Sequence, residues 1–265
     1  MSRFAPSKPK RFFSVAGGVV LVLVLVGVLA WPQLHSYARW RAGAYASSAR
    51  AAATPQQAIS RYQVAEALDP GNAGYRTQLA GLLMRDGRYS AALSTLKPVS
   101  GAAAAIIRSQ VYLEEGSDSS AIAAVNGATT SAGRTQLAMS YMVAGQSANA
   151  RRVRGGVGEA VLAGGLSLAQ ELYAQGMYRT TQRVLATTAN SPTKYLLQAH
   201  ALLAEQPSNH QLVLSAQAAT QKGLALDPAN LALHQLLESI DTNLGDTAGA
   251  ATQQQLISQL QSGNI

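Results

Sequence analysis

The stretch LAGLLMRDGRYSAALSTL, Leu79 to Leu96, decides the fold because the chain repeats it. It aligns without a gap with LAMSYMVAGQSANARRV, which begins at Leu137, and with LAQELYAQGMYRTTQRVL, which begins at Leu168. A fourth copy spans Arg108 to Val125 and lacks the apolar opening residue. Each copy contains a glycine, at intervals of 29, 29 and 31 residues: Gly87, Gly116, Gly145 and Gly176. Self-similarity at such a period predicts stacked structural repeats.

Each copy is interpreted as a helix, a tight turn and a second helix. The glycine ends the first helix in the left-handed conformation that glycine adopts at little cost. Larger apolar residues one turn along the same face, Tyr112, Tyr141 and Leu172, are expected to fill the space between units. Small residues recur where a neighbouring helix must approach closely: Ala80, Ala138 and Ala169 on first helices, and Ala92, Ala121 and Ala150 on second helices. The sequence predicts an all-α fold.

The segment PQQAISRYQVAEALDPGN precedes these copies and contains Ala58, Tyr62, Ala65 and Pro70. Its ending recurs in LALDPAN, residues 224–230, where Pro228 should stop one helix and Asn230 should cap the next. This pattern resembles the tetratricopeptide repeat (TPR). The resemblance implies a right-handed helical solenoid of six helix pairs plus a degenerate last pair, a TPR-like repeat domain over residues 37–262.

The repeats depart from the family pattern in length and regularity. Their period is shorter than the family's period of about 34 residues. Glycines such as Gly155 and Gly156 crowd the junctions between copies, and Arg108 and Arg154 replace apolar residues. An insertion near residues 206–210 breaks the register. We therefore expect an irregular solenoid in the middle of the chain.

The N-terminal region carries the charge and a long apolar stretch. Residues 1–50 contain seven basic and no acidic residues, whereas the remainder contains 14 basic and 13 acidic residues. The uncharged residues 14–31 are long enough to cross a hydrocarbon core of about 30 Å. They predict a single transmembrane helix ending near Pro32, after a basic cytoplasmic tail at residues 1–13. The alternative is a signal peptide cleaved after Ala30.

Four basic residues before the apolar stretch favour a cytoplasmic N-terminus. The expected location is the inner (plasma) membrane, with the lipid bilayer contacted through residues 14–31 and the repeat domain in the periplasm or otherwise outside the cytoplasm. The near-neutral body excludes a nucleic-acid binder, which needs basic groups spread over its folded surface. With 49 alanines and no cysteine in 265 residues, disulfide-stapled and sheet-rich folds are also excluded.

The sequence offers no catalytic constellation. The histidines His35, His200, His210 and His234 lack metal-ligand spacing. Glu114 and Glu115 are interpreted as a solvated helix terminus, and Arg151, Arg152 and Arg154 as a solvated helix end. Gly155 and Gly156 are interpreted as a helix breaker, because no strand precedes them to form a phosphate loop. We expect no enzyme activity, no catalytic or metal site, no cofactor and no small-molecule substrate.

The TPR resemblance implies that a concave surface of first helices binds extended or helical peptides. The expected function is a membrane-anchored scaffold that binds protein partners, subunits of a membrane complex, as an assembly or structural subunit of an envelope complex such as a pilus or secretion machine. The alternatives are a noncatalytic subunit of a cell-envelope polymer synthesis complex and a secreted or periplasmic binding module released by signal cleavage. The candidate contact residues are Gln78, Met84, Arg85, Gln136, Met139, Met142, Gln170 and Tyr173.

Overall fold

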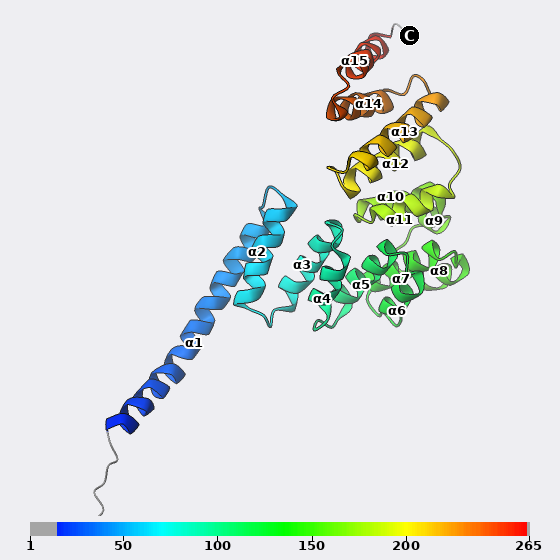
Figure 1. Ribbon diagram of the computed structural model, residues 1–265. Helices are drawn as coiled ribbons and strands as arrows, with labels where there is room; N and C mark the ends of the chain where they lie inside the picture. The colour runs from blue at the N-terminus through cyan, green and yellow to red at the C-terminus, as the bar shows by residue number, and fades with distance from the viewer. Residues whose placement is uncertain (1–14, 264–265) are drawn as a thin grey trace, which may run out of the picture. The chain divides into compact units, whose positions relative to one another are not determined.

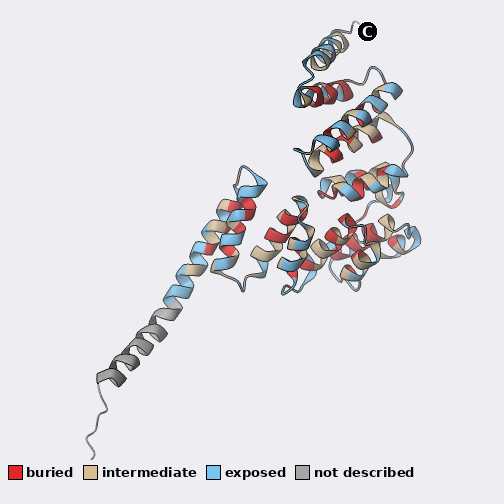
Figure 2. Cartoon of the chain, in the orientation of Figure 1, coloured by how far each residue is buried: buried red, intermediate tan, exposed pale blue. Residues whose placement is uncertain are grey.

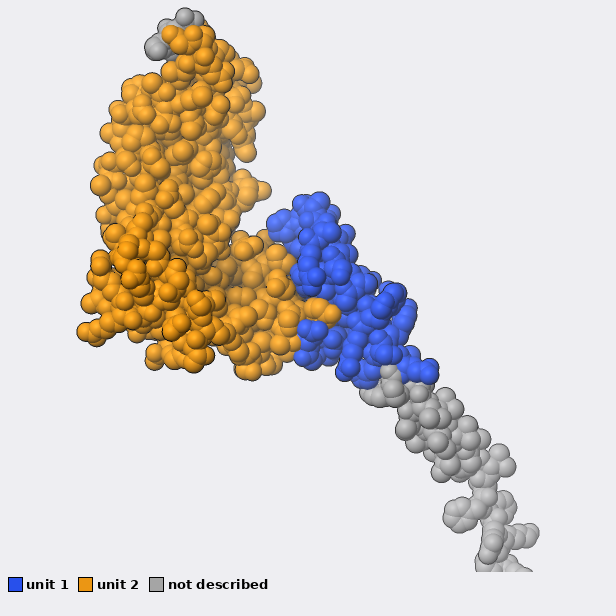
Figure 3. All heavy atoms as spheres, turned by 180° about the vertical axis from the view of Figure 1, so that it is seen from behind, with its two compact units in different colours: residues 1–72 blue, residues 73–265 orange. Residues whose placement is uncertain are grey.

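The computed structural model describes the backbone of residues 15–263 and the side chains of residues 33–263. Every regular element within that range is an α-helix, which confirms the all-α prediction for it. The chain divides into two compact units, residues 1–72 and 73–265, shown in different colours in Figure 3.

Unit 1 is a hairpin of α1 (Val15–Arg50) and α2 (Pro55–Leu68) (Figure 1). Helix α2 begins where the sequence supplies a proline at the first position and a Thr54 hydroxyl that accepts a hydrogen bond from the Gln57 N–H. The predicted Ala58, Tyr62 and Ala65 are buried in this hairpin, together with Ile59 of α2 and three alanines of α1, Ala42, Ala46 and Ala49.

Unit 2 continues as helical hairpins, with buried residues gathered where paired helices face each other (Figure 2). Its first three pairs are α3 (Ala73–Arg85) with α4 (Tyr89–Leu96), α5 (Ala102–Glu114) with α6 (Asp118–Val125), and α7 (Ser131–Val143) with α8 (Ser147–Val153). After the short α9 (Glu159–Leu162) follow α10 (Gly165–Ala174) with α11 (Tyr178–Ala186), α12 (Pro192–Glu205) with α13 (His210–Leu226), and α14 (Leu231–Leu244) with α15 (Thr247–Ser262).

The repeat register predicted from the sequence is confirmed at its defining positions. The four turn glycines have positive φ angles between 73° and 77°: Gly87, Gly116, Gly145 and Gly176. A side chain at these positions would be strained, so glycine determines where each first helix stops. The small residues of the pattern are all completely buried: Ala80, Ala92, Ala121, Ala138, Ala150 and Ala169.

The connection between α8 and α10 is irregular, as the crowded glycines predict. Arg154 ends α8 with a positive φ of 49°, and Gly155 follows at 55°. A Cβ atom on Gly155 would lie 2.5 Å from the backbone nitrogen of Thr135, so this glycine lets the loop approach the backbone of α7. The Gly156 N–H donates to the Thr135 hydroxyl at 2.8 Å. The two glycines therefore act as the predicted helix breaker.

The helix ends in the C-terminal part follow local sequence signals. Helix α13 stops at Leu226, just before Pro228, and the Asn230 side chain accepts a hydrogen bond from the Leu233 N–H at 3.2 Å. The predicted cap of α14 is thus confirmed. The predicted insertion forms the turn between α12 and α13, where Asn209 caps α13.

We correct the expected location in the inner membrane. No helix in the portion with described side chains is both long and apolar enough to span a bilayer. Residues 14–31, on which the transmembrane helix and the lipid contact were based, and the tail at residues 1–13 lie outside that portion. The helix boundary expected near Pro32 is also wrong, because α1 continues to Arg50.

Candidate functional site

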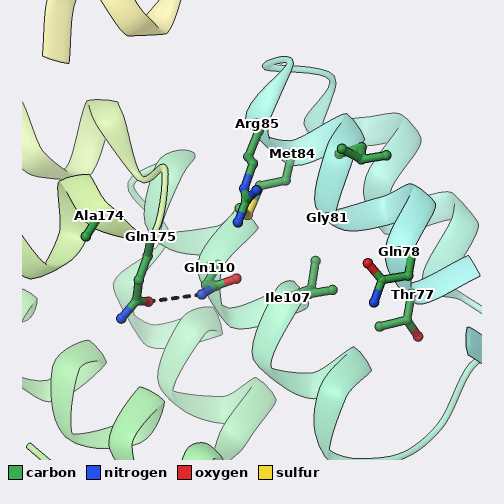
Figure 4. Close-up of a pocket in the computed structure, with 10 residues that line it drawn as sticks. Thr77, Gln78, Gly81, Met84, Arg85, Ile107, Gln110, Ala174 and Gln175 are labelled. Atoms are coloured by element: carbon green, nitrogen blue, oxygen red, sulfur yellow. Dashed lines mark hydrogen bonds between the residues drawn. The ribbon is translucent and has the colours of Figure 1, made fainter. Parts of the chain in front are cut away.

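The first helices of unit 2 line two neighbouring hollows, which together we call the inner groove. The first hollow has a volume of about 330 Å³ and lies between α3, α5 and the C-terminal end of α10. Figure 4 shows its residues, with Arg85, Gln110 and Gln175 converging on one side. The lining residues from α3 are Thr77, Gln78, Gly81, Leu82, Met84 and Arg85; the others are Ile107, Gln110, Ala174 and Gln175.

The second hollow, of about 490 Å³, lies between α5 and α7. Gln110 and Gln175 line both hollows, so the two hollows lie on either side of these residues. The remaining lining residues are Ile106 from α5 and Ser131, Ala132, Thr135, Gln136 and Met139 from α7.

Three repeat positions account for most of the lining. These positions lie ten, nine and six residues before the turn glycine, so they share one face of each first helix. They are Thr77, Gln78 and Gly81 in α3; Ile106, Ile107 and Gln110 in α5; and Thr135, Gln136 and Met139 in α7. The inner groove is therefore a direct product of the repeat.

Glutamine amides form the polar framework of the inner groove. The Gln110 Nε2 donates to the Gln175 Oε1 at 3.1 Å, and the Gln175 Nε2 donates to the Glu171 Oε1 at 2.9 Å. The Gln136 Nε2 donates to the Ser109 hydroxyl at 3.2 Å, which satisfies part of this buried side chain. These bonds fix the amides that separate the two hollows.

The inner groove is lined mainly by uncharged side chains. Arg85 is the only formally charged residue among those that line it. The Arg85 stem covers the turn after α10, since its Cγ lies 3.2 Å from where a Cβ on Gly176 would be. Amides, thioethers and aliphatic groups offer hydrogen bonds and apolar contacts, and the lining holds no carboxylate or imidazole for acid–base catalysis.

A buried carboxylate holds the α10 side of the inner groove in place. Glu114, at the end of α5, accepts hydrogen bonds from the Thr180 N–H at 3.0 Å and from the Thr180 hydroxyl at 2.7 Å. It also accepts from the Arg179 N–H at 3.2 Å and from the Tyr89 hydroxyl at 3.1 Å. The carboxylate thereby caps the N-terminus of α11, where free N–H groups and the helix dipole favour a negative charge. We call this the α5–α11 junction.

Neighbouring groups perturb Tyr89 and reinforce the junction. Burial raises the pKa of Tyr89 well above its ordinary value, and the negative charge of Glu114 raises it further. The Arg179 guanidinium lies 5.2 Å from the centre of the Tyr89 ring and opposes this rise. Arg183 adds a hydrogen bond to the Leu113 carbonyl at 2.9 Å. The junction thus joins α4, α5 and α11.

The structure brings five of the eight predicted contact residues together in the inner groove: Gln78, Met84, Arg85, Gln136 and Met139. Met84, Gln136 and Met139 are largely buried in its floor, whereas Gln78 and Arg85 are exposed. The other three lie elsewhere. Met142 packs in the core between hairpins, Tyr173 contacts the Tyr178 ring at 5.6 Å, and Gln170 is exposed on α10.

Sequence reasoning missed Ile107 and Gln110, although they occupy the same repeat positions as the predicted Gln78, Gln136 and Met139, and it missed the position of Ile106 in all three helices. Applying the repeat register to α5 would have found Ile107 and Gln110. No comparable signal marks Ala174 and Gln175, because they occupy different repeat positions and enter the lining through the turn of α10.

The interpretation of Glu114 as part of a solvated helix terminus is wrong, because its residue is 5% exposed. Glu115, beside it, is exposed as expected. Arg108 replaces an apolar residue because its guanidinium donates to the carbonyls of Leu96 and Val99 at the end of α4.

Arg151, Arg152 and Arg154 lie exposed around the end of α8, as interpreted from the sequence. The described side chains form no cluster of three or more His, Cys, Asp or Glu residues that could hold a metal ion.

Comparison with known proteins identifies the repeat in one segment. Residues 49–105 match the tetratricopeptide repeat family model. This segment contains α2, α3 and α4, including the stretch from Leu79 to Leu96. No curated protein matches the chain. Among solved structures, the complex of the TPR2AB domain of yeast Sti1 with pHSP90 is similar at 13% sequence identity and a TM-score of 0.33, over 88% of this chain and 92% of that chain.

Proposed function

We propose that this protein is a noncatalytic scaffold that binds a peptide segment of a partner protein in the inner groove. The observation that carries the proposal is the groove itself, where the same repeat positions on three successive first helices line two adjacent hollows. Helical-repeat proteins use such extended surfaces for protein binding. The match to the TPR family over residues 49–105 supports the same class of function.

The proposal assigns the repeat domain to residues 37–262 and the contact role to the predicted residues that line the groove. Gln170, Met142 and Tyr173 remain predicted contacts that the groove geometry does not support. The assignment to a pilus, secretion or polymer synthesis complex depended on the membrane location and is not part of this proposal.

A substitution that fills the groove should prevent peptide binding and therefore tests the proposal. Gly81 lies in the first hollow, and a Cβ there would be 3.7 Å from the Ile107 Cδ1, so Gly81→Leu should extend into the hollow. The matched control is Ala123→Leu, because Ala123 is exposed on α6 and outside the groove lining. The purified full-length chain is used to select binders from a displayed library of random 12-residue peptides.

Selected peptides should bind the wild-type chain and Ala123→Leu equally and should lose at least tenfold in affinity for Gly81→Leu. Far-UV circular dichroism should show the same helix content in all three proteins. If Gly81→Leu binds the peptides as well as the wild type does, the inner groove is not the binding surface.

A further inference from the structure

A third hollow lies on another face of α5, outside the inner groove. It has a volume of about 490 Å³ and is bordered by the α4–α5 loop, the end of α6 and the α6–α7 loop. Helix α5 contributes Ala105 and Arg108 to this hollow, whereas its Ile106, Ile107 and Gln110 line the inner groove. The two sites share no lining residue. We call the third hollow the loop-side hollow.

Small and apolar side chains form most of the wall of the loop-side hollow. Val99 and Val125 are buried in it, and Ala105, Ala124 and Ala128 are half-buried. Sites for small molecules usually measure about 300 to 1,000 Å³ and combine a largely apolar wall with a few polar groups. The loop-side hollow has this size and composition. Because its side chains are short, the apolar part of a ligand can lie against the helices themselves.

Arg108 is the only formally charged residue that lines the loop-side hollow. Its Nη2 donates to the Leu96 carbonyl at 2.7 Å and to the Val99 carbonyl, and these bonds hold the guanidinium in place at the end of α4. Within the described part of the chain, no carboxylate forms an ion pair with Arg108. Its Nε and Nη1 donors make no hydrogen bond there and stay accessible to solvent. A fixed guanidinium with free N–H groups suits a carboxylate, which accepts charge-assisted hydrogen bonds from it.

The single positive charge narrows the ligand class. One guanidinium compensates a carboxylate, which carries one negative charge, but not a phosphate monoester, which carries about −1.5 to −2 at pH 7. We infer that the loop-side hollow binds a small carboxylic acid with an apolar tail, whose ionised carboxylate pairs with Arg108. The tail lies against Ala105 on α5 and Ala124 on α6.

This acid is a ligand and not a substrate, because no carboxylate or imidazole for acid–base catalysis lines the loop-side hollow. The inference goes beyond the proposed function, since the inner groove is a separate site. The chain would thus carry a small-molecule site on one face of α5 and a protein-binding groove on another.

The ligand chemistry is tested first on the unaltered full-length chain, by isothermal titration calorimetry at pH 7. Butanoate, hexanoate and octanoate vary the apolar tail, and octanamide replaces the carboxylate with an uncharged group. Octanoate should bind saturably at one site, and affinity should rise by about twofold to fourfold per added methylene group that is buried. Octanamide should bind at least about tenfold more weakly than octanoate, because hydrogen bonds to a charged group are lost.

Protein variants then locate the site. Ala124→Leu places a larger side chain in the loop-side hollow, and Arg108→Met removes its charge. The matched control is Ala123→Leu, because Ala123 is exposed beside Ala124 and does not line the hollow. Ala124→Leu and Arg108→Met should each lose at least about tenfold in affinity for octanoate, and Ala123→Leu should bind it normally. Far-UV circular dichroism checks the fold, and if Arg108→Met loses helix, the octanamide comparison still tests the charge.

Three results would each overturn the inference: no saturable binding of octanoate up to about 10 mM, equal binding of octanoate and octanamide, or unchanged binding of octanoate by Ala124→Leu. The proposed function is tested separately, since Gly81→Leu should leave octanoate binding intact. Saturating octanoate should also leave the affinity for peptides selected on the inner groove unchanged. Displacement of those peptides would place the acid in the inner groove and contradict its assignment to the loop-side hollow.

Discussion

Helices α3, α5 and α7 present the same three repeat positions to the inner groove, whereas α10 presents none of them. In α10 those positions are Leu166, Ser167 and Gln170, and the groove is lined instead by Ala174 and Gln175 at the helix end. The sequence period is nearly the same in both regions. The repeat period therefore predicts the structure of each hairpin but not how one hairpin packs on the next.

Both regions are held by apolar packing, and the second adds a polar junction. The hairpins from α3 to α8 pack through buried alanines and apolar residues that recur with the period. The α10–α11 hairpin packs on α5 and α6 through a buried apolar cluster, and the α5–α11 junction adds polar contacts between partners 65 to 70 residues apart in sequence. Substitutions in the junction and in the apolar packing should therefore lower stability by different amounts.

Removing the carboxylate of the junction should have the largest effect. Glu114→Ala leaves the N–H groups of Arg179 and Thr180 without their acceptor, and hydrogen bonds to charged groups contribute about 1.5 to 3 kcal/mol each. We expect a loss of about 3 to 5 kcal/mol in the free energy of unfolding by urea. Glu115→Ala is the control and should change stability by less than about 0.5 kcal/mol. Equal effects would mean that the junction does not hold α11 on α5.

The next largest loss of stability is expected where the irregular loop contacts the backbone of α7. Gly155→Ala places a Cβ 2.5 Å from the Thr135 nitrogen and requires a positive φ, so about 2 to 4 kcal/mol of stability should be lost. Gly158→Ala is the matched control, because nothing lies within 4 Å of its Cβ position. Thermal and urea unfolding measure both. A stable Gly155→Ala protein would show that the loop does not need its close approach to α7.

The difference between the regular hairpins and the α5–α11 junction shows which parts of the fold the sequence predicts. The hairpins, the turn glycines and the buried alanines follow from local residues, since helix propensity and the need for a left-handed turn act within one copy. The junction could not be predicted. Nothing around Glu114 indicates that its carboxylate will cap the N-terminus of α11 at Thr180, and an acidic pair before a glycine has the pattern of a solvated helix end. Of the groove, the repeat predicts α3, α5 and α7 but not Gln175.

Overpacking a buried alanine tests the regular region. Ala138 is completely buried on α7, so Ala138→Leu should force neighbouring helices apart and lower stability by about 1 to 3 kcal/mol. Ala73→Leu at the exposed start of α3 should be nearly neutral. Urea unfolding of the two variants gives the comparison. The reverse ranking would contradict the repeat register.

Removing the hydroxyl of Tyr89 should weaken the junction less than removing the carboxylate of Glu114. Tyr89→Phe removes one hydrogen bond to Glu114 and should lower stability by about 1 to 2 kcal/mol at neutral pH. Because the pKa of Tyr89 is raised in the folded protein, its contribution is complete below the ordinary tyrosine pKa of about 10 and is lost as the pH rises above it. Unfolding measured from pH 8 to 11 should therefore show a smaller alkaline loss in Tyr89→Phe than in the wild type. Identical pH profiles would show that Tyr89 ionises as freely in the folded chain as in the unfolded one.

The smallest expected effect is a gain in stability. It comes from another glycine-to-alanine substitution, Gly81→Ala, the same exchange that should destabilise the irregular loop at Gly155. Gly81 lies inside α3, where glycine costs about 0.5 to 1 kcal/mol relative to alanine. Its φ is not positive, and a Cβ there meets only the Ile107 Cδ1 at an ordinary contact distance of 3.7 Å. Gly81→Ala should therefore raise the free energy of unfolding by about 0.5 to 1 kcal/mol and leave room in the first hollow for a peptide. A loss of stability instead would mean that α3 and α5 approach too closely at this level for a methyl group, and the groove would have to be narrower than its volume indicates.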